Sequence, residues 1–250
     1  MAHVALAIRQ RERPGMQQQR TFTINYGPSA RQRWEIRGVT FDGTYLWFST
    51  TFQSIVPTTS PRLLQVDPQK GTLVNVVQTT VPNTQNLLDI AWNGDGFYGL
   101  TAETPNPFAQ GHVHLIDITG QIRVPDLVAG LPNDVRGICT DGYYFYITYL
   151  QTSPTSITRI AKYEPRGNRV FDTAGFTVGT GQASGIVHDG YFLLEKPDPV
   201  LNFTRLYYTI PPKLVTATKL YNLGADNSSE QAPCAFDGYY VWEFDSTWVP

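Results

Sequence analysis

Apolar and polar positions alternate in short runs along the whole chain, and one phrase recurs five times. Each copy is a small or apolar run, then Asp-Gly or Asn-Gly, then an aromatic-rich run. The residues that anchor the copies are Asp42, Asn93, Asp141, Asp189 and Asp237. Successive anchors lie 51, 48, 48 and 48 residues apart. A fixed period in this range is typical of a repeat architecture, and no stretch shows sustained helical periodicity.

The Asp-Gly pairs predict β-hairpins. A type I′ turn needs positive φ at both central residues, so Asp-Gly between β-prone runs favours it. A third strand with its own turn is predicted at 63–71, 112–120 and 157–167, and a fourth strand at positions such as 72–77. Four antiparallel strands in roughly 50 residues, repeated around an axis, are typical of a β-propeller blade.

The two ends of the chain predict how the ring closes. After the fifth copy only residues 244–250 remain, which are too few for two more strands, whereas 3–8 and 20–26 resemble third and fourth strands. We therefore expect an all-β, five-bladed propeller of four-stranded antiparallel blades, the last closed by strands from both termini. It forms a single domain, 1–250, with blades at about 37–85, 86–134, 135–182, 183–230, and 231–250 joined with 1–30.

Composition narrows the functional classes. Charged residues make up 16% of the chain and the net charge is −2, which argues against general nucleic-acid binding. Arginines gather in the first 37 residues, where we interpret them as solvated positions, with a basic arm for an anionic partner as the alternative. No signal peptide or transmembrane segment is predicted. Cys139 and Cys234 fall in non-neighbouring repeats, so buried thiols are expected.

One repeated position carries candidate chemistry. Seven residues before each anchor stands an acid or an amide: Glu35, Asn86, Asp134, Gln182 and Glu230. Because this position precedes the innermost strand, the five side chains are expected around one mouth of the central channel, with Arg37 and Arg136 near them. Three interpretations stay open: a clamp onto the backbone of adjacent blades, a calcium site formed by a ring of oxygens, and a polar ligand pocket.

A second repeated position lies four residues before each anchor. Small residues crowding the axis are expected there, and four of the copies have Gly38, Gly137, Gly185 and Pro233. The remaining copy has Asp89 instead. We therefore add Asp89 to the candidate ligand-binding residues at the axis.

Catalysis is the alternative function. Glu35, Asp134 and Glu230 resemble the three axial carboxylates of five-bladed glycoside hydrolases, and that resemblance implies the roles of acid, base and helper for them. Other chemistry is less well supported. His112 and His114 share one face of an outer strand without a third ligand, which predicts no metal site, and His188 is expected to be a packed residue.

The phrase from Phe41 to Trp47, together with blade count, length and period, resembles the tachylectin-2 type of lectin. The resemblance implies a propeller that binds sugars. We therefore predict a non-catalytic recognition or structural module for a glycan or protein partner, without nucleic-acid binding or membrane insertion. A subunit of a larger assembly, such as a cell-surface or virion appendage, is a compatible setting. No cofactor is expected beyond the calcium considered above.

Overall fold

The computed structural model describes residues 5–12, 18–25, 34–52, 60–103, 110–132, 134–151, 157–172, 182–188, 193–198, 204–209, 213–219, 234–237 and 240–245. Within these ranges every regular element is a β-strand. Accordingly, no helix that could cross a membrane occurs among them. The all-β prediction is confirmed.

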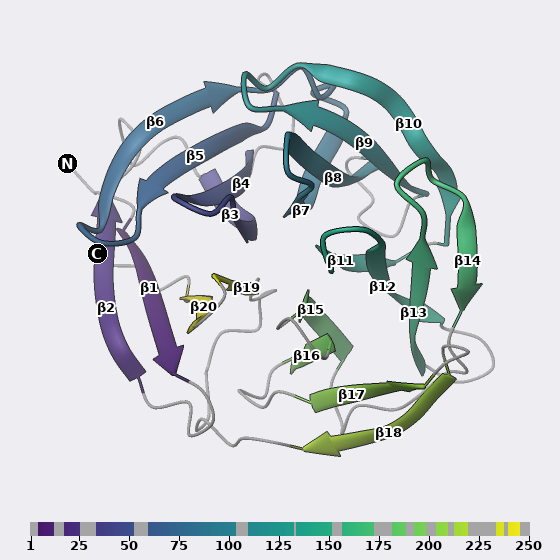
Figure 1. The fold of residues 1–250 in the computed structure, drawn as a ribbon. Coiled ribbons are helices and arrows are strands. Elements are labelled where there is room, and N and C mark those ends of the chain that lie inside the picture. The colour runs from purple at the N-terminus through teal and green to yellow at the C-terminus, as the bar shows by residue number, and fades with distance from the viewer. Residues whose placement is uncertain are drawn as a thin grey trace.

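The described strands pair into five antiparallel sheets of four strands, each named here by its innermost strand (Figure 1). The β3 sheet contains β3 (Trp34–Phe41), β4 (Leu46–Phe52), β5 (Arg62–Asp67) and β6 (Thr72–Gln78). The β7 sheet contains β7 (Gln85–Trp92), β8 (Gly96–Glu103), β9 (Gly111–Asp117) and β10 (Ile122–Leu131). The β11 sheet contains β11 (Val135–Thr140), β12 (Phe145–Gln151), β13 (Ile157–Tyr163) and β14 (Arg169–Asp172). The β15 sheet contains β15 (Gln182–His188), β16 (Leu193–Asp198), β17 (Thr204–Thr209) and β18 (Lys213–Lys219).

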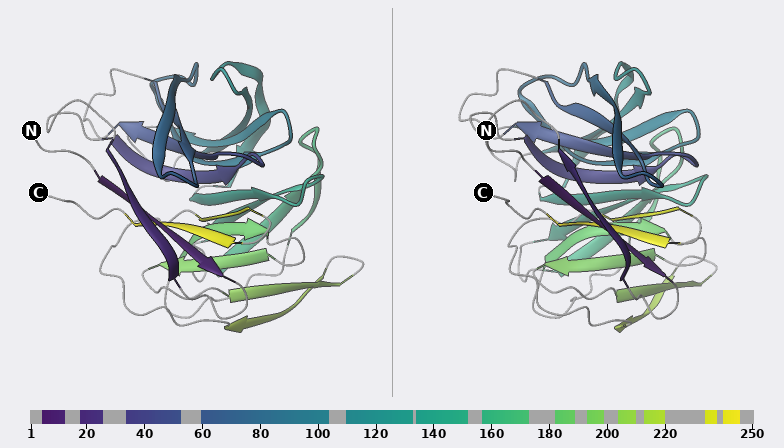
Figure 2. Two further views of the ribbon diagram at one scale, coloured as in Figure 1. Left: turned by 60° about the vertical axis from the view of Figure 1, so that its left-hand side comes forward. Right: turned by 90° about the vertical axis from the view of Figure 1, so that its left-hand side faces the viewer.

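The remaining sheet joins the two ends of the chain, as the sequence predicted. It contains β19 (Cys234–Phe236), β20 (Tyr240–Asp245), β1 (Ala5–Glu12) and β2 (Gln18–Asn25). The purple β1 lies against the yellow β20 in both views of Figure 2, and their register sets Ile8 opposite Phe244. This pairing removes the free edge that β20 would otherwise expose.

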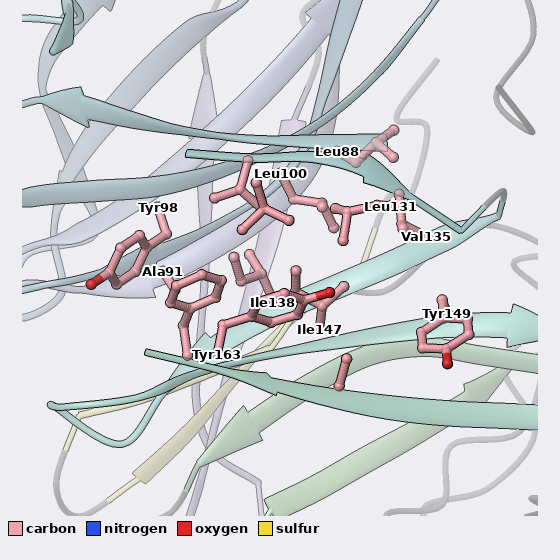
Figure 3. Close-up of a cluster of buried hydrophobic side chains, with 14 of the residues drawn as sticks. Leu88, Ala91, Tyr98, Leu100, Leu131, Val135, Ile138, Ile147, Tyr149 and Tyr163 are labelled. Carbon is pink, nitrogen blue, oxygen red and sulfur yellow. The ribbon is translucent and has the colours of Figure 1, made fainter. Parts of the chain in front are cut away.

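The inner strands surround a central axis. Contacts link β3 to β7, β7 to β11, β11 to β15, β15 to β19, and β19 back to β3 (Figure 1). Apolar side chains fill the layers between adjacent sheets. In the layer shown in Figure 3, Leu100 and Ile138 pack together with the rings of Tyr98 and Phe145, whose centroids are 4.5 Å apart. Both faces of β8 are covered. Nearly all of its residues are therefore buried, and buried and exposed positions do not alternate along it.

The hairpin turns differ from the predicted type. Gly43 has a φ of 100°, but among described non-glycine residues only Asp126 and Asp134 have positive φ. The type I′ prediction is therefore wrong, because Asp42 precedes the two central residues of the turn and is not one of them. Its Oδ1 accepts the N–H groups of Thr44 at 2.7 Å and Tyr45 at 2.6 Å, and its Oδ2 accepts the indole N–H of Trp47 at 2.6 Å. The anchor is a structural turn residue.

Candidate functional site

Four of the five predicted acid or amide residues lie where the inner strands begin. Glu35 and Asn86 are the second residues of β3 and β7, Gln182 is the first of β15, and Asp134 immediately precedes β11. Glu230 lies outside the described residues. The backbone thus places these positions at one end of the axis.

The carboxylate of Asp134 is held within its own sheet. It is buried and forms an ion pair with Arg136, whose Nε lies 2.5 Å from its Oδ1. The carbonyl of Asp134 accepts the N–H of Leu150 at 3.0 Å, and its φ is 66°. The negative charge of Asp134 is thus balanced by a side chain of its own sheet, and none of these contacts is the bond to the backbone of an adjacent blade that the clamp interpretation requires.

Each of four inner strands contains a β-bulge at the same repeat position. The register shifts lie between Ile36 and Gly38, Leu87 and Asp89, Val135 and Gly137, and Ala183 and Gly185. A bulge inserts an unpaired residue and redirects the side chain that follows it. In three of these strands the residue after the bulge is glycine, and in β7 it is Asp89.

Asp89 ties three inner strands together at the axis. Its Oδ1 accepts the N–H of Ile90 at 2.9 Å, its Oδ2 accepts that of Ile138 at 2.9 Å, and the carboxylate also accepts the N–H of Val39. The residue is only 5% exposed. Burial raises the pKa of its carboxyl well above the usual value, and the three backbone N–H groups oppose this rise only in part.

The glycine opposite Asp89 has a steric reason. A Cβ placed on Gly38 would lie 2.4 Å from Oδ1 of Asp89 and 2.5 Å from its Cα. Contacts this close require the backbone to move, so the axis has no room for a second side chain beside Asp89 at this level. The glycine at this repeat position in β3 therefore leaves the space that the side chain of Asp89 occupies.

A cavity of about 120 Å³ lies at the other end of the inner strands, beside the Asp-Gly hairpins. Its wall consists of the residues that stand one, two and three positions before the anchors. The outermost level contains Phe41, Trp92, Thr140, His188 and Phe236. We refer to this cavity as the axial pocket.

The polar side chains of the axial pocket are two threonines, one histidine, the indole of Trp92 and the thiol of Cys139. Thr40 Oγ1 accepts the N–H of Trp92 at 2.9 Å, which links β3 to β7. The hydroxyl of Thr140 donates to the carbonyl of Tyr144 at 2.8 Å. The ring of His188 stacks parallel to that of Tyr146, with centroids 6.3 Å apart. Among the described residues, no Asp or Glu side chain lines this pocket.

The sequence predicted a ligand site at the start of the inner strands, which is the opposite end of the axis from this pocket. The position directly before each anchor carries two phenylalanines, a tryptophan, a threonine and a histidine, and this chemical variety within a repeat was the available signal. The packed role predicted for His188 is confirmed by its stacking on Tyr146, although the ring also lines the pocket. Cys139 is a buried thiol outside any disulfide, as expected, and lies in the pocket wall.

The pair His112 and His114 does acquire a third group, but not as a metal site. Nδ1 of His112 lies 2.9 Å from Oδ1 of Asp126. The N–H of Asp126 donates to Nδ1 of His114 at 3.1 Å, and Nε2 of His114 lies 2.9 Å from Oε1 of Gln85. Both nitrogens of His114 are thus engaged, and burial lowers its pKa. No cluster of three potential ligands suited to a metal occurs among the described side chains.

No protein-family profile and no curated protein matches the chain in sequence. Solved structures do resemble it. A chain of a nidogen–laminin complex aligns with a TM-score of 0.59 and 15% identity, covering 94% of this chain and 82% of that one. Myxococcus xanthus glutaminyl cyclase aligns at 0.53 and 12%, covering 86% and 91%. PQQ-bound aldose sugar dehydrogenase from Streptomyces coelicolor aligns at 0.53 and 11%, covering 90% and 84%.

These similarities establish the fold as a propeller. At such low identity they establish nothing finer. The similar structures include both a protein–protein complex and enzymes, so the fold leaves the activity open and the argument has to come from the site.

Proposed function

We propose that the chain is a five-bladed propeller acting as a non-catalytic recognition module, with its ligand bound in the axial pocket. The observation that carries this proposal is the chemistry of the two ends of the axis. The described carboxylates near the axis, Asp89 and Asp134, are engaged by backbone N–H groups and by Arg136. The pocket itself combines aromatic rings, hydroxyls and an imidazole.

This arrangement supports binding over glycoside hydrolysis. Hydrolysis requires two carboxyl groups facing each other across the scissile bond. A carboxylate that is already neutralised by an arginine, as Asp134 is, supplies neither an acid nor a free base. The axial pocket, by contrast, contains the stacking surfaces and hydrogen-bonding groups that a small polar ring needs.

The size of the pocket favours part of a sugar. A cavity of roughly 150 Å³ accommodates a benzene-sized molecule, so about 120 Å³ accepts a group smaller than a whole ring, such as one edge of a terminal sugar. Together with the likeness to tachylectin-2-type lectins in blade count and period, this supports a glycan whose terminal residue enters the pocket. Protein recognition would instead use the outer loops.

Two variants test where the ligand binds. Thr140→Phe fills the pocket with a side chain that Phe41 and Phe236 already provide at the same repeat position. Asn86→Ala removes an amide at the opposite mouth and serves as the matched control. On an array of immobilised glycans, we expect the parent chain and the Asn86→Ala variant to bind the same glycan. Thr140→Phe should lose that binding by at least about tenfold while keeping its melting temperature within a few degrees.

Two results would contradict the proposal. Binding that survives Thr140→Phe and disappears in Asn86→Ala would move the site to the acid and amide ring. Steady hydrolysis of the bound glycan that is abolished in the double variant Glu35→Gln, Glu230→Gln would show an enzyme.

A further inference from the structure

The hairpin geometry fixes which backbone groups face the axis. Three anchors close their turns with a hydrogen bond: Asp42 N to Tyr45 O at 3.1 Å, Asn93 N to Gly96 O at 3.0 Å and Asp141 N to Tyr144 O at 3.1 Å. In an antiparallel ladder, hydrogen-bonded pairs alternate with pairs whose N–H and C=O groups point away from the partner strand. Residues one and three positions before an anchor therefore direct their backbone groups toward the axis.

The deeper of these two levels holds a carboxylate. The N–H groups of Val39, Ile90 and Ile138, each three residues before its anchor, all donate to Asp89. Backbone N–H groups that converge in this way receive the oxygens of a carboxyl group. The protein thus contains, in its own core, an example of the group that this part of the axis accepts.

The outer level repeats the deeper one and opens into the axial pocket. It consists of the residues directly before the anchors, about 7 Å further along the strands. Where the structure shows a partner at this level, the partner is again an oxygen, because Thr40 Oγ1 accepts the N–H of Trp92. Phe41 and Thr140 line the pocket, and the alternation of the ladder implies that their backbone groups also face it.

The charged groups around the pocket suit an anion. His188 lies in the wall, and Nζ of Lys162 lies over the ring of its stacking partner Tyr146, 5.5 Å from the ring centre. The described anchor carboxylates directly after the pocket wall are each engaged within their own hairpin: Asp42 by the indole of Trp47 at 2.6 Å, Asp141 by the hydroxyl of Tyr146 at 2.6 Å, and Asp237 by the indole of Trp242 at 2.7 Å. Below the pocket, burial raises the pKa of Asp89, which reduces the negative charge there.

We infer that the axial pocket binds a carboxylate, so that the glycan ends in an acidic sugar such as a uronic acid. The backbone N–H groups of Phe41 and Thr140 receive the carboxylate as those of the deeper level receive Asp89. That of Trp92 remains bound to Thr40, and His188 adds a donor. This inference rests on the proposed function, because it assigns a ligand class to the same pocket. The partner is recognised through one acidic ring rather than through an extended neutral chain.

Sugar pairs that differ only at C6 provide the test. D-Glucuronate against D-glucose, and D-galacturonate against D-galactose, are titrated calorimetrically into the purified full chain. We expect at least one acid to bind about tenfold more tightly than its neutral partner. His188→Phe keeps the aromatic packing seen at Phe41 and should remove most of that preference. His112→Phe, the same substitution on β9 away from the pocket, should leave it unchanged.

The outcomes separate the two proposals. If each acid binds no more tightly than its neutral partner while Thr140→Phe still abolishes glycan binding, the carboxylate inference is wrong and the recognition function stands. If the chain binds neither these sugars nor any arrayed glycan, the glycan-binding function is wrong and the inference with it. An acid preference that persists in His188→Phe but disappears in Thr140→Phe would assign recognition to the backbone alone and overturn the role of His188.

Discussion

At the scale of single residues, Asp89 organises the centre of the molecule. Innermost strands expose unpaired backbone groups toward the axis, and buried N–H groups require acceptors. One carboxylate supplies acceptors to three strands at once. The bulge in β7 aims it there, and Gly38 leaves space for it. A single departure from the glycine pattern of the repeat thereby links three sheets.

Replacing Asp89 by glycine, the residue at this position in three other repeats, should destabilise the protein by about 2–3 kcal/mol. The reason is that three buried N–H groups lose their acceptor. Urea unfolding followed by tryptophan fluorescence measures the change. A variant as stable as the parent chain would show that water replaces the carboxylate without cost.

The effect of Asp89→Gly should also depend on pH. The folded-state pKa of Asp89 lies above the unfolded value of about 3.9, so the folded chain retains a proton that the unfolded chain releases. The stability contributed by this site is fully present below the unfolded value and is lost as the pH rises through the folded one. The difference in unfolding free energy between parent and variant should therefore be larger at pH 5 than at pH 8. A constant difference would contradict the buried, proton-retaining carboxyl.

At the scale of elements, the recurring hairpin is a unit built on its anchor side chain. In the turn before β12, Oδ1 of Asp141 accepts two backbone N–H groups and Oδ2 accepts the hydroxyl of Tyr146. The same design joins Asp237 to the indole of Trp242 at 2.7 Å. In the β7 sheet, Oδ1 of Asn93 accepts the N–H groups of Asp95 at 3.0 Å and Gly96 at 2.7 Å. The same chain thus contains a version of this turn in which an amide replaces the carboxylate.

This internal comparison predicts different costs for two substitutions. Asp141→Asn keeps the acceptor for the turn, as Asn93 does, and should cost less than about 1 kcal/mol. Asp141→Ala removes all three acceptor contacts and should cost about 2 kcal/mol or more, because hydrogen bonds to a charged acceptor are the stronger ones. Chemical denaturation of the two variants measures both values. Equal costs would mean that the turn contacts contribute nothing.

The hairpins also show how far the sequence could predict the elements. Alternating apolar runs around Asp-Gly located both strands of each described hairpin, because side-chain periodicity records which residues are buried. The turn type was wrong, since Asp-Gly is compatible with several turns and the choice depends on whether Asp42 lies inside the turn or caps it from one residue earlier. The bulges before Gly38 and Asp89 could not be predicted, because register shifts leave no mark on composition.

At the scale of the whole molecule, counting repeats and examining the ends predicted how the ring closes, through β1 and β20. The site was predicted less well. Counting seven residues back from each anchor located the start of the inner strands correctly for Glu35 and Asn86. The axial pocket lies at the opposite end, and its chemistry depends on which backbone groups face the axis. That information lies in the hydrogen-bond alternation of the folded sheets and not in residue types.

The claim that ligands enter the hairpin end of the axis can be tested directly with tryptophan as a reporter. Trp92 lines the axial pocket, whereas Trp34 begins β3 beside Glu35, at the opposite end. Indole N–H resonances of the ¹⁵N-labelled chain, assigned with Trp→Phe variants, would be followed while D-glucuronate is added. We predict that the Trp92 resonance shifts progressively while that of Trp34 stays in place. A shift of Trp34 with Trp92 unchanged would contradict the account.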